Sequence, residues 1–128
     1  MAEPFRHTLR VRYAEVDMQG HVFNAHYLTY VDDATGAWMR ERLGDYQAAG
    51  FDIVLKTATL TWHRGAAYDD MLAIDMAVSR WGTTSFDVTF EGSVDERPVF
   101  TATVTYISVT PGTVTPAPPP PAVRAALA

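Results

Sequence analysis

An aspartate and a glycine turn stand directly before the longest apolar periodic segment of the sequence. Asp17 precedes Gly20, and an apolar-faced helix is expected to begin near Asn24. The first amides of a helix lack intrahelical acceptors and carry a partial positive charge, so they can stabilise an oxyanion. A plain strand-to-helix connection with a solvated aspartate would have the same sequence pattern. The residues alone therefore leave open a carboxylate paired with an oxyanion-binding amide and a purely structural turn.

The helix predicted after this turn is long enough to run along one face of a sheet. Apolar side chains recur at three- and four-residue steps from Tyr27 onwards. Asn24 or His26 could begin the helix, with Asn24 the better N-cap, and Gly44 is expected to end it. About 17 helical residues correspond to roughly 25 Å. Gly36 inside this segment lowers helix propensity, which suggests a close neighbour at that position.

Five further stretches alternate between apolar and polar side chains, as half-buried strands do. They cover residues 8–14, 57–62, 72–79, 85–91 and 100–106. The last two connections are short enough for hairpins, so the strands that they join are expected to be antiparallel. A helical turn is expected over residues 45–50. One long helix and about five strands, each with a single apolar face, predict an α+β fold in which an antiparallel sheet curls around the helix.

Length and composition favour one globular domain over residues 1–128. The chain is 48% hydrophobic and 20% charged, which suits a single core. A proline-rich tail from about residue 111 is expected to stay outside the sheet, with one or two helical turns around Arg124 and Leu127. A single helix covers five strands poorly and an exposed strand edge invites pairing, so a homodimer is expected.

Charge and cysteine content exclude several classes of function. The net charge of −5, without a basic run, argues against nucleic acid or an anionic membrane as the main partner. The absence of cysteine excludes disulfides, thiolate metal sites and cysteine nucleophiles. The histidines and acidic residues do not have the spacing of a metal site, so no metal is expected. No stretch has the apolar length of a signal peptide or membrane span, and a cytoplasmic protein is expected.

The order of residues around the glycine turn resembles that of hot-dog-fold acyl-CoA thioesterases of the 4-hydroxybenzoyl-CoA thioesterase type. The likeness rests on the pattern D-x-x-G-H-V-x-N-x-x-Y from Asp17 to Tyr27, and it extends more weakly to residues 80–85 and the C-terminal end. The resemblance implies a hot-dog fold and thioester hydrolysis at the interface of a homodimer, which could pair further into a tetramer. It implies no cofactor other than the coenzyme A of the substrate.

By position in this pattern, Asp17 matches the catalytic carboxylate, and the backbone amide of Asn24 matches the donor that polarises the thioester carbonyl. Tyr27 matches an aromatic residue that could line the acyl pocket, although core packing is the simpler role. His21 could orient Asp17 or the acyl group, but a lone histidine beside a glycine turn is more often a structural hydrogen-bonding residue.

Coenzyme A carries several phosphate charges, which a chain of net charge −5 must meet with local arginines. The candidates are Arg80, Arg64 and Arg124, and ordinary surface charge is the alternative for each. The resemblance also places Thr84 and Ser85 near the pantetheine arm of the substrate.

Two routes are open to the predicted aspartate. Asp17 is expected to be ionised at neutral pH and is a weak base towards water, which favours direct attack on the thioester. A water-mediated general-base route stays open, because positioning can offset poor basicity. Two other functions also remain in view: a thioesterase that acts on acyl-carrier protein, and a non-catalytic acyl-CoA-binding module.

Overall fold

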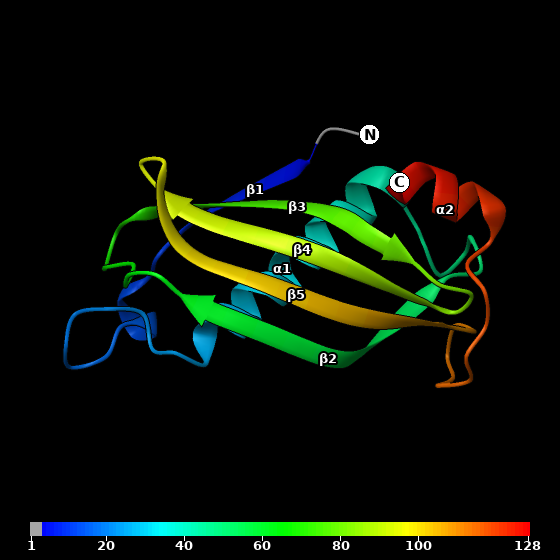
Figure 1. Cartoon of the computed structure of the whole chain (residues 1–128), viewed down its shortest axis with the longest axis horizontal. Coiled ribbons are helices and arrows are strands. Elements are labelled where there is room, and N and C mark those ends of the chain that lie inside the picture. Colours follow the sequence, from blue (N-terminus) through cyan, green and yellow to red (C-terminus); the bar gives the residue numbers. More distant parts are fainter. Residues whose placement is uncertain (1–3) are drawn as a thin grey trace.

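One curved antiparallel sheet wraps around a long helix, and a second, short helix packs at one end (Figure 1). The computed structural model describes residues 4–128. The strands lie in the order β1-β3-β4-β5-β2, so that β1 and β2 form the two edges. In chain order the elements are β1 (Phe5–Arg10), the 3-10 turn η1 (Tyr13–Glu15), α1 (His26–Leu43), β2 (Asp52–Trp62), β3 (Met71–Trp81), β4 (Ser85–Val94), β5 (Arg97–Val109) and α2 (Pro121–Leu127).

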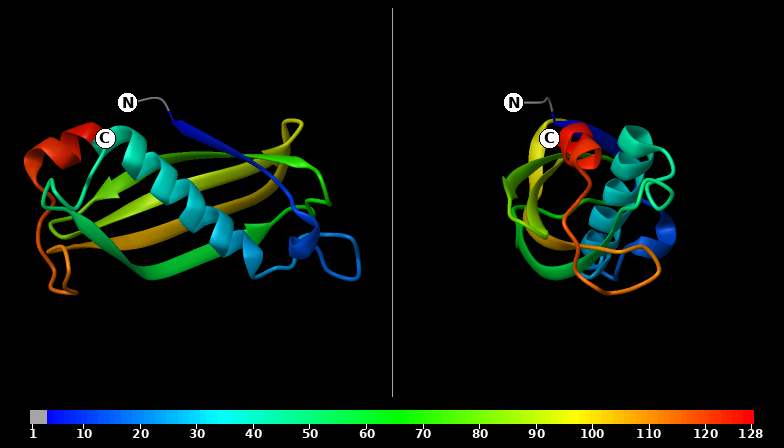
Figure 2. Two further views of the ribbon diagram at one scale, coloured as in Figure 1. Left: turned by 180° about the vertical axis from the view of Figure 1, so that it is seen from behind. Right: turned by 90° about the vertical axis from the view of Figure 1, so that its right-hand side faces the viewer.

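The core lies between α1 and the concave face of the sheet (Figure 2). Helix α1 contributes Tyr30, Ala34 and Trp38, which are almost fully buried. Each large apolar side chain buried in this way contributes about 1.5–3 kcal/mol to folding. The inner face of the sheet supplies Leu72, Ile74, Met76, Phe86, Val88, Phe90 and Val104. The predicted alternation of strands β3, β4 and β5 is therefore confirmed as one buried face and one partly exposed face.

The two predicted hairpins are confirmed, since β3 pairs with β4 and β4 pairs with β5 in antiparallel fashion. Asp95 and Glu96 join β4 to β5 with positive φ angles of 49° and 65°. Two consecutive residues of this kind form the turn that matches the twist of antiparallel strands. Residues 45–50 also turn as expected, with the Ala49 N–H donating to the Asp45 carbonyl at 3.1 Å.

Two predictions for the first part of the chain are wrong, the end of the first strand and the N-cap of the long helix. Strand β1 ends at Arg10 rather than continuing through residue 14, because Arg12 begins a capped turn that Glu15 closes. The N-cap of α1 is Ala25 and not Asn24, and no side chain caps this end. The predicted end of the long helix is confirmed, because Gly44 follows α1 with φ 67°. A methyl group at Gly36 would meet only the flexible guanidinium of Arg40, so nothing rigid packs there.

The proline-rich tail was expected to stay outside the sheet, and this is wrong at one point. Pro116 forms a bridge with Val109 at the end of β5, and the Ala117 N–H donates to the Ser108 carbonyl at 2.9 Å. The short helix expected near the C-terminus is confirmed as α2. It buries Val123 and Leu127 against the core, so the tail closes one end of the sheet.

Candidate active site

Asp17 lies in a small hairpin between η1 and α1. The Asp17 N–H donates to the His21 carbonyl at 2.8 Å, and the Gly20 N–H donates to the Asp17 carbonyl at 3.0 Å. Gly20 has a φ of 81°, a conformation that favours glycine. Oδ1 of Asp17 accepts the Gln19 N–H at 2.9 Å, whereas no group within residues 4–128 donates to Oδ2. The turn thus holds the Asp17 side chain through one oxygen and leaves the other available.

Glu15 closes the base of this hairpin and was missed by the sequence-based prediction. Its carbonyl accepts the Phe23 N–H at 2.9 Å, and its carboxylate accepts bonds from Arg12 and from the Tyr30 hydroxyl. Burial alone would raise the pKa of Glu15, but the hydrogen bonds from Arg12 and Tyr30 outweigh it and lower the pKa. The three-residue spacing from Arg12 to Glu15 is the only sequence signal that could have indicated this arrangement.

The N-terminus of α1 offers amides that no acceptor within residues 4–128 uses. The His26 N–H donates to the Phe23 carbonyl at 2.9 Å, and the Tyr27 N–H donates to the Asn24 carbonyl at 3.4 Å. Within the described part of the chain, the amides of Asn24 and Ala25 have no acceptor. Because these donors lie at the positive end of an 18-residue helix, they are suited to bind a developing negative charge.

An apolar cavity of about 370 Å³ adjoins these amides. Its walls come from the first turns of α1 and from the edge strand β2: Asn24, Ala25, Leu28, Ala58, Leu60 and Trp62. Residues 57–62 were expected to form a half-buried strand, but Trp62 in β2 is 48% exposed. Leu28 of α1, which also lines the cavity, is 38% exposed. The cavity therefore opens at the free edge of the sheet, where an apolar group could lie beside the Asn24 amide.

Tyr27 is buried behind this cavity rather than lining it. Its hydroxyl accepts the Ala66 N–H at 3.0 Å, and its ring packs edge-on against Trp62, with 6.4 Å between the ring centroids. Burial raises the pKa of Tyr27. The hydrogen bond from Ala66 opposes this shift, and the negative charge of Asp17 adds to it. The tyrosine therefore supports the cavity wall through Trp62.

His21 contacts Asp17 through its backbone and not through its ring. The ring packs on Gly65, where an added methyl group would lie 2.7 Å from the His21 Cγ. His21 also forms a bridge with Ala67. These contacts dock the Asp17 hairpin on the loop that follows β2, which is a structural role for His21.

Arg80, Thr84 and Ser85 come together at the opposite end of the sheet. In Figure 1 the β3–β4 connection and the segment before α1 lie at opposite ends of the molecule. The Arg80 Nε donates to Asp87 at 2.8 Å, and its Nη2 donates to Ser85 at 3.1 Å. The Thr84 carbonyl accepts the Ser108 N–H at 2.7 Å. One protomer therefore does not bring these three residues to Asp17.

Arg124 is engaged at the same end. Its guanidinium donates to the Gly82 carbonyl at 2.7 Å and lies 4.9 Å from the centre of the Trp81 ring. Both contacts anchor α2 to the β3–β4 turn. Arg124 is therefore a packing residue in this structure.

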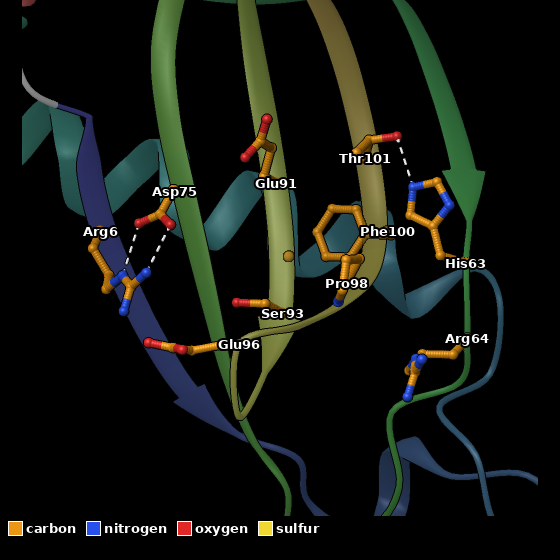
Figure 3. A pocket seen from close by; sticks show the side chains of 11 residues that line it. Arg6, His63, Arg64, Asp75, Glu91, Ser93, Glu96, Pro98, Phe100 and Thr101 are labelled. Carbon is orange, nitrogen blue, oxygen red and sulfur yellow. Dashed lines mark hydrogen bonds and ion pairs between the residues drawn. The ribbon is translucent and has the colours of Figure 1, made fainter.

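Arg64 lines a different cavity, of about 720 Å³, on the outer face of the sheet (Figure 3). Arg6 and Asp75 form an ion pair of 2.8 Å on one side, and Arg64 lies on the other, beyond the β4–β5 strands. Among residues 4–128 no carboxylate pairs with Arg64. Arg64 precedes Gly65, which packs on the His21 ring of the Asp17 hairpin, so its backbone adjoins the hairpin while its side chain lines the outer-face cavity.

The described residues offer no alternative built around a metal or a membrane span. Within residues 4–128 no three histidine, aspartate or glutamate side chains gather in a way that could hold a metal ion. Neither α1 nor α2 combines the length and the apolar character that crossing a bilayer requires.

Three solved structures share this fold along nearly the whole chain. The protein AQ1494 of Aquifex aeolicus superposes with a TM-score of 0.88 at 23% identity, covering 98% of this chain and 100% of that one. The 1,4-dihydroxy-2-naphthoyl-CoA thioesterase Slr0204 of Synechocystis gives 0.83 at 18% identity, with coverage of 97% and 95%. A thioesterase of Thermus thermophilus, complexed with coenzyme A and zinc, gives 0.82 at 21% identity, with coverage of 95% and 90%.

These similarities confirm the predicted α+β fold, an antiparallel sheet of five strands around one long helix, as a hot-dog fold. The narrower resemblance to the 4-hydroxybenzoyl-CoA type stays a prediction. The family profile of the thioesterase-like superfamily matches residues 11–127, which include the Asp17 hairpin, α1 and four of the five strands. The chain therefore belongs to the thioesterase-like superfamily.

Proposed function

We propose that the protein hydrolyses acyl-CoA thioesters to a free acid and coenzyme A. The observation that carries the proposal is the pair of amides at Asn24 and Ala25, which have no acceptor within residues 4–128, belong to residues that line an apolar cavity, and follow directly on the Asp17 hairpin. The acyl group would lie in the cavity, and its thioester oxygen would accept the Asn24 N–H. Removing such a donor typically costs about 10²- to 10³-fold in rate.

Asp17 would supply the attacking group or the base. In the direct route, a carboxylate oxygen forms a bond to the thioester carbon, and the carbonyl electrons move to the oxygen that Asn24 holds. When the carbonyl re-forms, the carbon–sulfur bond breaks and the coenzyme A thiolate leaves. Water then hydrolyses the acyl-aspartyl anhydride and restores Asp17. In the alternative route, Asp17 takes a proton from a water molecule that attacks the same carbon.

Contacts to coenzyme A would come from more than one part of the fold. Arg64 has no partner carboxylate within residues 4–128 and is the better candidate for a phosphate contact. Arg80 already pairs with Asp87, so it offers less free charge. Thr84 and Ser85 lie beside Arg80, and all three would reach a thioester at Asp17 only from a second copy of the chain.

A homodimer through β2 would meet this requirement. Strand β2 is an edge strand, and its Trp62 is 48% exposed. A two-fold axis beside an edge strand pairs it with its own copy in antiparallel fashion, so the far end of one protomer lies near the Asp17 end of the other. Lys56, the only lysine of the sequence, lies at a bulge in β2. An amine-reactive cross-linker should therefore join two Lys56 residues in a species that sedimentation identifies as a dimer; a monomer would refute this assembly.

A thiol-release assay tests the proposed activity. Because the chain has no cysteine, a thiol reagent reports only the coenzyme A that is released. We expect turnover with at least one acyl-CoA of a panel of aliphatic and aromatic thioesters. Asp17→Asn should lower kcat by about 10²-fold or more, whereas the control Asp95→Asn, which makes the same change in an exposed hairpin turn, should not.

The possible outcomes separate the alternatives. Binding of acyl-CoA without turnover of any thioester would indicate a binding module and end the proposal. If the protein hydrolysed these acyl groups only when they are attached to acyl-carrier protein, its substrates would be acyl-carrier-protein thioesters and not acyl-CoA. A single turnover in ¹⁸O-water tests the direct route, since label in the Asp17 carboxylate requires an anhydride that water opens at the aspartyl carbon. Label only in the product acid fits either attack by water on the thioester or opening of the anhydride at its acyl carbon.

A further inference from the structure

A second carboxylate lies two residues before Asp17 and has no part in the chemistry above. The Glu15 side chain is 11% exposed. Its oxygens accept the Arg12 N–H at 2.8 Å, the Arg12 Nη2 at 2.8 Å, the Arg12 Nε at 3.2 Å and the Tyr30 hydroxyl at 2.9 Å. A buried carboxylate with four donors is held in one orientation, because charge-assisted bonds are short and strong.

These bonds connect three segments that must stay in register at the candidate site. Glu15 begins the hairpin strand that leads to Asp17, and its carbonyl holds Phe23, the residue before Asn24. Tyr30 belongs to α1, so its bond to Glu15 fixes the hairpin on the helix. Burial and the bond to Glu15 raise the pKa of Tyr30, which keeps the hydroxyl protonated as a donor.

We infer that Glu15 is a positioning residue, which together with Arg12 and Tyr30 sets the distance between the Asp17 carboxylate and the Asn24 amide. The inference rests on the function proposed above, in which these two groups act on the same thioester. A displacement of about 1 Å in such a pair can cost roughly 10²-fold in rate. The loss is expected in kcat, because the apolar cavity that holds the acyl group is built from α1 and β2.

Three variants test this role. Glu15→Gln keeps the size of the side chain but removes its charge, and we expect kcat to fall about 10- to 100-fold while KM stays within about 3-fold. Tyr30→Phe removes one of the four bonds and should lower kcat by about 3- to 10-fold. Glu41→Gln makes the same change at an exposed position of α1 and should match the wild type. Each variant is assayed well below its own melting temperature, so that unfolding does not contribute.

Hydrogen exchange gives a readout that does not depend on activity. In Glu15→Gln the amides of Asp17 and Phe23 should exchange at least about 10-fold faster, while the amides of β4 and β5 keep their wild-type rates. Wild-type kcat in both Glu15→Gln and Tyr30→Phe would overturn the inference, even if exchange became faster. If Glu15→Gln does not fold, Tyr30→Phe decides alone. A wild-type protein that hydrolyses no thioester would refute the proposed function, whereas unchanged exchange in Glu15→Gln of an active protein would refute only the positioning role of Glu15.

Discussion

Replacing Gly92 by alanine should strain the core directly beneath the candidate site. Gly92 in β4 lies opposite Phe100 in β5, and an added methyl carbon would lie 2.1 Å from the Phe100 Cε1 and 2.4 Å from its Cδ1. Ordinary carbon–carbon contacts are about 3.5–4.0 Å, so the ring must move by more than about 1 Å. Phe100 is fully buried and packs against Tyr27 at 5.4 Å between ring centroids, which leaves little room for that movement.

The expected cost of Gly92→Ala is about 2–3 kcal/mol, which is typical of overpacking in a dense core. With a urea dependence of about 2 kcal/mol per molar, the unfolding midpoint should fall by about 1 M. Gly36→Ala is the matched control, because its methyl group meets only the Arg40 guanidinium, and it should leave stability unchanged or raise it by up to about 1 kcal/mol.

A double-mutant cycle with Phe100→Leu isolates the predicted clash. The shorter side chain removes the ring atoms that the new methyl group meets, so the double variant should be more stable than the sum of the two single effects by at least about 1 kcal/mol. Effects that add to within about 0.5 kcal/mol would show that the strain lies elsewhere. A Gly92→Ala midpoint equal to that of the wild type would refute the argument altogether.

Two further predictions concern acid stability and the tail. Hydrogen bonds from Arg80 and then from Thr105 lower the pKa of Asp87, with burial opposing them, so its contribution to stability is present above the ordinary aspartate pKa of about 3.9 and is lost as the pH falls below it. The loss of stability caused by Asp87→Asn should therefore be larger at pH 7 than at about pH 3 in urea titrations, and an equal loss at both would contradict it. Leu127→Ala, at a side chain that is 3% exposed, should cost about 2–4 kcal/mol and lower Tm by about 10 °C. Val114→Ala, 78% exposed, should change Tm little, and equal melting of the two variants would mean that α2 does not contribute to the core.

Periodicity was sufficient to predict the elements whose side chains meet one uniform environment. Leu72, Ile74 and Met76 alternate because one face of β3 packs on α1, and the sequence records that burial directly. The end of β1 was harder to predict, because Val11 continues the alternation although the Arg12–Glu15 turn has already ended the strand. Local hydrogen bonds of that kind compete with the ladder of a strand and are not visible in hydrophobicity.

In the candidate site, too, the features set by local sequence were predictable and those set by tertiary contacts were not. The Asp17 turn and the start of α1 shortly after Asn24 follow from local sequence, and their approximate positions were predictable. The Arg80–Asp87 pair depends on the register of two strands, and that register shifts at an irregularity beside Arg80. The role of Glu15 depends on Tyr30, which lies fifteen positions further along the chain. Contacts that depend on how distant segments align in the folded protein cannot be predicted from residue spacing alone.

The hairpin between Glu15 and Phe23 has a consequence for how this protein could change during evolution. Its backbone bonds alternate between Glu15 with Phe23 and Asp17 with His21, so the two strands tolerate exchanges of side chains but not a change in their number. Inserting or deleting one residue between positions 15 and 24 would turn the following side chains to the opposite face. Descendants of this sequence that keep its chemistry are therefore expected to vary freely in residue type at Met18 and Gln19, while the count of residues from Asp17 to Asn24 stays constant.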